Sequence, residues 1–112
     1  MLPQGHRLHK EKDIKTLFAN GKSVFDVYCG FKYRKNELSV SRFAVVVGLK
    51  VSKRALERNR IRRQLREIIR LRLDVLKPGY DVLVLVRPDS LGQTYQTLET
   101  HLVGALKKAG IL

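Results

Sequence analysis

Acidic residues are scarce in this sequence of 112 residues. Ten Asp and Glu stand against 23 Lys and Arg, which leaves a formal net charge of +13. Such an excess repels itself in a compact state, so a polyanionic partner is the natural reason to tolerate it. Nucleic acid is the first candidate partner, and an anionic membrane surface is the second.

Cysteine is scarcer still, and long hydrophobic runs are missing. Cys29 is the single cysteine, so no intramolecular disulfide can form, and no apolar run approaches transmembrane length. Residues 1–13 contain no hydrophobic segment of the kind that signal peptides carry. We therefore expect a cytoplasmic protein. The length and an apolar content of 44% predict one folded domain over residues 1–112.

The apolar pattern predicts alternating helices and strands. Continuous apolar runs at 43–49 and 81–86 are typical of central strands that are covered on both faces. The polar stretch 35–41 indicates a hairpin loop, and the spacing of Ser90 and Gln93 predicts a capping box for the last helix. Together these signals predict a small α+β sandwich with helices packed on a sheet. The expected elements are helices at 10–20, about 53–73 and from 89 or 90 onward, and strands at 27–33, 43–49 and 81–86.

The segment 58–70, RNRIRRQLREIIR, combines a core face with a dense positive charge. At about 100° per residue, Ile61, Leu65, Ile68 and Ile69 fall on one arc of a helix. Glu67 is the single acid in the segment and lies at the flank of the opposite arc, so that arc is a cationic stripe with almost no internal neutralisation. Like charges four residues apart destabilise a helix, which favours a phosphate-binding stripe over an ordinary solvated face. The polar side of this helix carries Arg58 at its border and Asn59, Arg62, Arg63, Arg66 and Arg70.

The nature of the nucleic acid is less strongly indicated. The sequence KPG at 77–79 ends the basic helix, so it cannot run on as a zipper. Strand alternation predicts that Tyr28 and Lys32 share one face beside Gly30, where they could stack on and clamp an unpaired strand. An ordinary edge-strand surface explains the same pattern, so composition points to RNA weakly.

Other chemistry finds little support in the sequence. The GKS at 21–23 lacks the earlier glycine of a phosphate-binding loop and is typical of a helix-to-strand turn. No pair of carboxylates has a spacing that argues for acid/base catalysis, and the histidines and Cys29 are too isolated to form a zinc site. Cys29 falls on the apolar strand face, which predicts a buried, inert thiol. We therefore expect no catalytic residue and no metal site in the protein itself.

Three stretches resemble one known family, in order and with compatible spacing. RNRIRRQLRE at 58–67, preceded by VGLKVSKRALE at 47–57, closely resembles the signature of the bacterial ribonuclease P protein component. HRLHKEKDIKTLFANGKSV at 6–24 resembles the opening of that family, and YDVLVLVRPDS at 80–90 resembles its last strand. The likeness covers nearly the whole chain.

The resemblance implies an α-β-β-β-α-β-α fold with a left-handed crossover through the arginine-rich helix. It implies a subunit that binds the catalytic RNA of ribonuclease P and the 5′ leader of precursor tRNA. The RNA would hydrolyse the phosphodiester with Mg²⁺, while the protein positions the substrate and promotes metal binding at the RNA. No organic cofactor, small-molecule substrate or membrane partner is expected.

The resemblance also carries specific residues. Ile14 stands where the family usually has Phe, Leu49-Lys50 stands where it has two lysines, and Lys32 stands where it often has an apolar or aromatic side chain. Leader contacts are therefore predicted to be more electrostatic here. The expected RNA-binding residues are Arg58, Asn59, Arg60, Arg62, Arg63, Arg66 and Arg70, with further phosphate contacts from Lys50, Lys53 and Arg54. The expected leader cleft comprises Ile14, Phe18, Tyr28 and Lys32.

Two other functions remain open at this point. A structural RNA-binding protein similar to a small ribosomal protein would have the same composition, and the arginine signature argues against it. A membrane-surface protein is disfavoured because the apolar helix faces are needed to cover the sheet.

Overall fold

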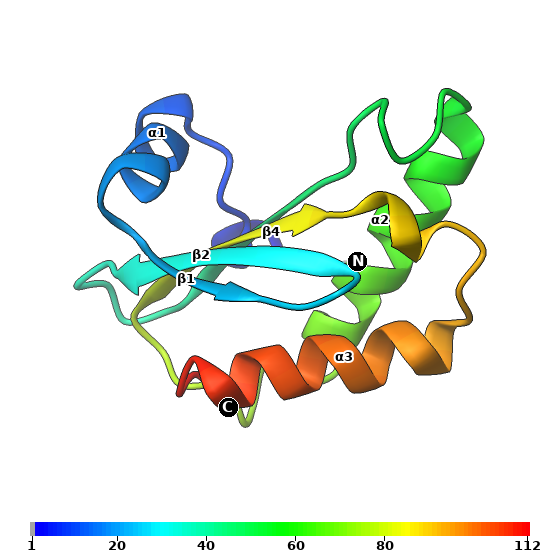
Figure 1. The fold of residues 1–112 in the computed structure, drawn as a ribbon. Coiled ribbons are helices and arrows are strands. Elements are labelled where there is room, and N and C mark those ends of the chain that lie inside the picture. Colours follow the sequence, from blue (N-terminus) through cyan, green and yellow to red (C-terminus); the bar gives the residue numbers. More distant parts are fainter. Residues whose placement is uncertain (1) are drawn as a thin grey trace.

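The computed structural model describes residues 2–112 and contains three α-helices on a four-stranded sheet (Figure 1). The elements follow the order α-β-β-β-α-β-α that the family resemblance implied, with two short 3₁₀-helices added. They are η1 (Gln4–His6), α1 (Glu11–Asn20), β1 (Lys22–Phe25), β2 (Cys29–Lys35), β3 (Arg42–Val46), α2 (Ala55–Arg70), β4 (Tyr80–Val86), η2 (Pro88–Ser90) and α3 (Tyr95–Lys108).

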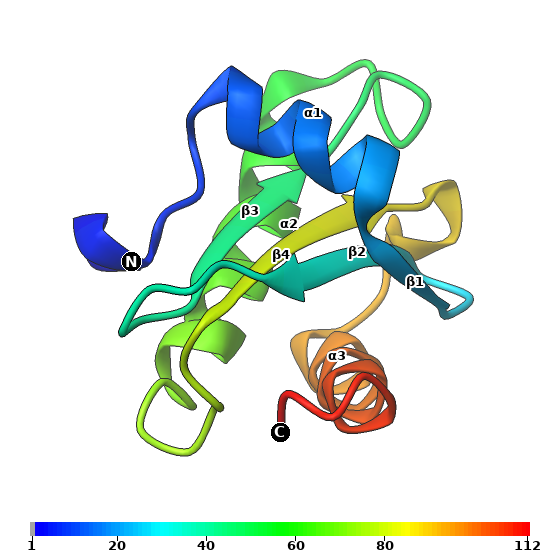
Figure 2. The same cartoon turned by 90° about the vertical axis from the view of Figure 1, so that its left-hand side faces the viewer.

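The sheet has the strand order β1-β2-β4-β3. Strand β2 runs antiparallel to β1 and β4, whereas β3 and β4 are parallel and are joined through α2. In Figure 2, α2 passes behind the sheet while β4 lies to the right of β3, which is the left-handed sense of crossover. Most such connections are right-handed, so this rare feature of the expected fold is confirmed.

The larger core lies between the sheet and helices α2 and α3. The predicted apolar arc of α2 is confirmed, because Ile61, Leu65, Ile68 and Ile69 are all buried there. They pack with Phe31, Phe43 and Val84 of the sheet and with the apolar side of α3. This packing turns the arginines of α2 away from the sheet.

Helix α1 covers the opposite face of the sheet with a much smaller core (Figure 2). Leu17 of α1, Leu8 and Leu83 of β4 are buried together, with Ile14 and Leu85 partly buried beside them. Gly21 ends the helix, donating its N–H to the carbonyl of Leu17 over 2.9 Å. A Cβ at Gly21 would lie 2.5 Å from that carbonyl oxygen, so the GKS segment is a helix-to-strand turn that requires glycine.

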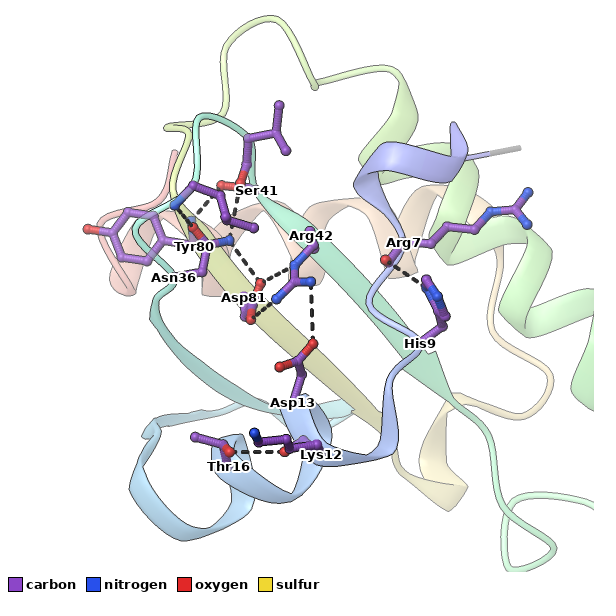
Figure 3. A network of polar contacts seen from close by, with 12 residues as sticks. Arg7, His9, Lys12, Asp13, Thr16, Asn36, Ser41, Arg42, Tyr80 and Asp81 are labelled. Carbon is purple, nitrogen blue, oxygen red and sulfur yellow. Dashed lines mark hydrogen bonds and ion pairs between the residues drawn. The ribbon is translucent and has the colours of Figure 1, made fainter.

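A polar network fastens α1 to the sheet (Figure 3). Arg42 of β3 donates to both carboxylate oxygens of the buried Asp81 of β4, at 2.8 and 2.7 Å. The same guanidinium lies 3.4 Å from Asp13 of α1, and Asn36 donates to Asp81 over 2.9 Å. Arg42 therefore links the helix to two strands.

Several expectations about the strands are wrong. Strand β1 was not predicted from periodicity, and β2 begins two residues later than expected. The stretch 35–41 is not a hairpin loop, because β4 lies between β2 and β3. Strand β3 is an edge strand and not a central one; it is covered along its edge by the N-terminal segment, where Leu8 donates to the carbonyl of Phe43 over 2.8 Å. Its apolar run reflects cover on both faces, because Phe43 and Val45 are buried in the larger core and Ala44 packs against the smaller one.

The last helix also begins later than expected. The hydroxyl of Ser90 is buried and donates to the carbonyl of Tyr28 over 2.7 Å, so it is not available as a helix cap. Thr94 caps α3 in its place by accepting from the N–H of Thr97 over 3.1 Å. Of the helices in residues 2–112, none is long and apolar enough to cross a membrane.

Candidate RNA interface

The α2 surface opposite the larger core is cationic, as predicted. Four of the seven expected residues, Asn59, Arg60, Arg63 and Arg70, are exposed, while Arg58, Arg62 and Arg66 are half-buried. The register of α2 produces this arrangement, because burying one apolar arc leaves the arginine arc to solvent.

Three arginines form what we call the cationic cluster: Arg7, Arg62 and Arg66. The pKa of Arg66 is lowered from its ordinary value, first by burial and then by the charges of Arg62 and Arg7. Arg7 donates to the carbonyl of Leu2 over 2.9 Å, and Arg62 donates to the side-chain oxygen of Asn59. Within residues 2–112, no acidic side chain forms an ion pair with any of the three. An anion such as a phosphate would relieve this repulsion.

Arg7 belongs to the cationic cluster, although no pattern in the sequence predicted it there. It comes from the N-terminal segment, which follows the edge of β3 toward α2. Helical spacing could not have found it, since the residue lies far from 58–70 along the chain.

The C-terminal end of the stripe differs from its centre. Arg70 forms an ion pair with Glu67, with Nε 2.9 Å from Oε2. This pairing is the main reason why the pKa of Glu67 falls to about 2. The expectation of a stripe with almost no internal neutralisation is therefore wrong at Arg70, because the helix brings residues 67 and 70 to neighbouring positions.

The loop before α2 holds the other predicted phosphate contacts. Lys50, Lys53 and Arg54 are all exposed. Ser52 fixes this loop: its hydroxyl donates to Glu57 over 2.7 Å and accepts from the N–H of Arg54 over 3.1 Å. Arg58 donates to the carbonyl of Ser52 over 2.9 Å, so it positions the loop as well as contributing charge.

A second surface lies beside α1, where the helix leaves part of the sheet uncovered. We call it the open sheet face: Phe18, Lys32, Val46 and Leu85. Lys32 pairs with Leu83 across the strands, so it shares the face that α1 packs against. Phe18 is 52% exposed and Val46 is 43% exposed, while Lys32 is half-buried, so this face offers an exposed aromatic ring and a partly exposed cation. Ile14 lies on the same side but is partly buried in the small core.

Tyr28 does not join this surface, which corrects the prediction. Its ring packs edge-on against His101 of α3, with centroids 4.6 Å apart, on the side of the larger core. The chain between β1 and β2 is a turn, in which Tyr28 donates its N–H to Asp26 over 3.0 Å. Strand alternation begins at Cys29 and cannot be extended back to Tyr28.

Cys29 and the possible metal ligands are the other groups that the sequence raised. Burial, with the nearby charge of Asp26, raises the pKa of the Cys29 thiol to about 12, so it stays protonated and inert as predicted. Among residues 2–112 there is no group of three His, Cys, Asp or Glu side chains that could hold a metal ion.

Comparison with known proteins agrees with this geometry. The model of the ribonuclease P family matches residues 2–110. The ribonuclease P protein component of Clostridium botulinum (strain Loch Maree / Type A3) is 35% identical over 107 residues, which are 95% of this chain and 96% of that protein. The solved RNase P protein of Thermotoga maritima is 31% identical, with a TM-score of 0.84 over 91% of this chain and 96% of the other.

A mutant of the Staphylococcus aureus RNase P protein shares the fold at a TM-score of 0.91, with 23% identity over 97% of this chain and 92% of that one. The arginine motif, the sheet topology and these relatives agree, and the family model covers residues 2–110. The chain belongs to the ribonuclease P protein family and is the protein component of that endonuclease.

Proposed function

We propose that the protein binds the ribonuclease P RNA through the cationic cluster and holds the 5′ leader of precursor tRNA on the open sheet face. The observation that carries this proposal is the position of Arg62 and Arg66 on one face of α2 beside Arg7 of the N-terminal segment, with no ion pair to any of the three among the described residues. Arginine suits planar, bidentate phosphate contacts, and the loop with Lys50, Lys53 and Arg54 continues the positive surface.

The open sheet face suits a single strand better than a duplex. It offers the exposed ring of Phe18 for base stacking and Lys32 for a phosphate. A purely structural RNA-binding role is not favoured, because the relatives are subunits of the endonuclease.

Catalysis in this proposal belongs to the RNA. Mg²⁺ bound at the RNA would supply the activated water and stabilise the leaving oxygen. The protein contributes cations that hold RNA phosphates together and a surface that orients the leader. We also propose a cytoplasmic location, in keeping with a substrate that is newly transcribed tRNA.

The direct test is a precursor-tRNA cleavage assay at low Mg²⁺ with a bacterial ribonuclease P RNA. We expect correct 5′ cleavage with RNA and protein together, and none with the protein alone. A protein that bound the RNA without changing its cleavage would contradict the proposal and leave a structural role.

Leader contact has its own test in Phe18→Ala. Removal of one ring that stacks on a base is expected to weaken binding of a precursor by about 1–3 kcal/mol and to leave mature tRNA unaffected. An equal loss of affinity for precursor and mature tRNA would show that Phe18 does not contact the leader.

A further inference from the structure

Phe25 is an aromatic side chain that the functions above do not use. It is 69% exposed and lies at the end of β1, where it pairs with Gly30 of β2. A Cβ on Gly30 would lie 3.8 Å from Cδ1 of Phe25 and 4.0 Å from Cβ of Leu85. The ring therefore lies over the glycine, on the same face of the sheet as Leu85, while most of the side chain remains accessible.

A hollow adjoins the ring, between the end of β1, the end of β4 and the loop before α2. Its apolar lining includes Phe25, Leu85, Leu49 and Pro88, and its cations are Lys50 and Arg87. Leu49 is 69% exposed. The lining residues that the structure describes include no acidic side chain.

This combination matches the chemistry of an unpaired nucleotide. An exposed ring supplies a stacking surface for any base, and flanking cations supply phosphate contacts. The charges favour a polyanion over an apolar peptide, because Lys50 and Arg87 have no acid beside them in the hollow.

We propose that Phe25 stacks on a leader base, with Lys50 and Arg87 contacting the neighbouring phosphates. The inference rests on the proposed leader binding and extends it, from Phe18 on α1 across the sheet face to the β1–β2 turn. Lys32 lies on this same face, so a single strand crossing it meets a ring, a cation and a second ring.

A simpler role for Phe25 must be separated from this one. An aromatic ring that covers a strand glycine stabilises the sheet without binding anything. Truncation of the ring would then lower the melting temperature and have no selective effect on RNA.

The experiment compares binding of leader-bearing precursor tRNA and mature tRNA by the complex of the protein with ribonuclease P RNA. Phe25→Leu is expected to weaken precursor binding about 5- to 150-fold and to leave mature tRNA unchanged, as for one base that is no longer stacked. Phe25→Tyr should retain the preference for precursor, because it keeps the ring. Val75→Ala removes an apolar side chain that is 65% exposed outside the hollow, and it should change neither value.

Single 4-thiouridine substitutions along the leader provide a second readout. We expect one leader position to crosslink within residues 22–32 in the wild-type complex. Crosslinks confined to other segments would overturn the inference. So would an equal loss of affinity for precursor and mature tRNA in Phe25→Leu.

Two further outcomes are distinguishable. A wild-type complex without preference for precursor would overturn leader binding itself, whereas a preference that survives Phe25→Leu would overturn the role of Phe25 alone. If Phe25→Leu instead dispersed a concentration-dependent dimer, the hollow would be a self-association surface and the inference would fail.

Discussion

Arg42 and Arg66 are both half-buried arginines, yet their environments are opposite. Hydrogen bonding to Asp81 raises the pKa of Arg42, whereas burial and two neighbouring arginines lower the pKa of Arg66. Arg42 has its counter-charges within the fold, and Arg66 has none among the described side chains. The comparison separates arginines that stabilise the structure from arginines that are available to a partner.

The largest expected effect is on stability and comes from substituting Arg42, the arginine whose charge is paired within the fold. Arg42→Ala leaves the buried Asp81 with Asn36 as its remaining side-chain donor, and it also removes the link to α1. We expect a loss of about 3 kcal/mol in the free energy of unfolding, measured by urea titration. Arg63→Ala removes an exposed charge on α2 and should cost less than about 0.5 kcal/mol. An equal loss of stability in Arg66→Ala would contradict the assignment of Arg42 to the fold and of Arg66 to a partner.

Substitutions in the cationic cluster are expected to change stability less than Arg42→Ala does and to change RNA binding more. The double variant Arg62→Ala/Arg66→Ala should reduce the slope of log affinity against log salt by about 0.7–0.9 for each phosphate that it no longer neutralises. Its melting temperature should not fall, because like charges are removed. Arg70→Ala is the matched control and should change the slope less, since Glu67 already pairs with Arg70. Equal slopes for the double variant and the wild type would show that the cluster is a solvated surface.

The smallest expected effect concerns the pH dependence of the Arg70–Glu67 pair. The pKa of Glu67 is about 2 in the folded protein, below the ordinary glutamate value of 4.5. The pair therefore stabilises the fold above pH 4.5, and this contribution is lost as the pH falls from 4.5 toward 2. Arg70→Ala should raise the pKa of Glu67 toward its ordinary value in a carboxyl NMR titration. A midpoint that stays near 2 would show that Arg70 is not the main cause.

The sequence predicted those features that depend on local periodicity. The apolar and cationic arcs of α2 follow from helical spacing alone, and both are confirmed. Strand β4 was expected to be central and is central, because its continuous apolar run reflects burial on both faces. For β3 the same pattern misled, because side chains on both of its faces pack in the two cores although the strand lies at the edge of the sheet.

The candidate site was predicted only in part, because some of its residues are brought together by segments that lie far apart in the sequence. The family motif identified the arginines of α2, but Arg7 reaches Arg66 through the course of the N-terminal segment. Phe25 was not singled out because the short strand β1 carries little periodic signal. The ring of Phe25 lies over Gly30 of β2, and this contact cannot be read from the sequence of β1. Tyr28 was misplaced because a turn interrupts the alternation just before β2.

The N-terminal segment also has a consequence for solubility. Its backbone pairs with the outer edge of β3 at Phe43, and Leu2 and Leu8 anchor it in the two cores. Exposed strand edges invite pairing between molecules, so this segment shields the protein from edge-to-edge aggregation. Because the same segment carries Arg7, proteolytic trimming of the first eight residues would remove a protective strand cover and one arginine of the cationic cluster in a single cut.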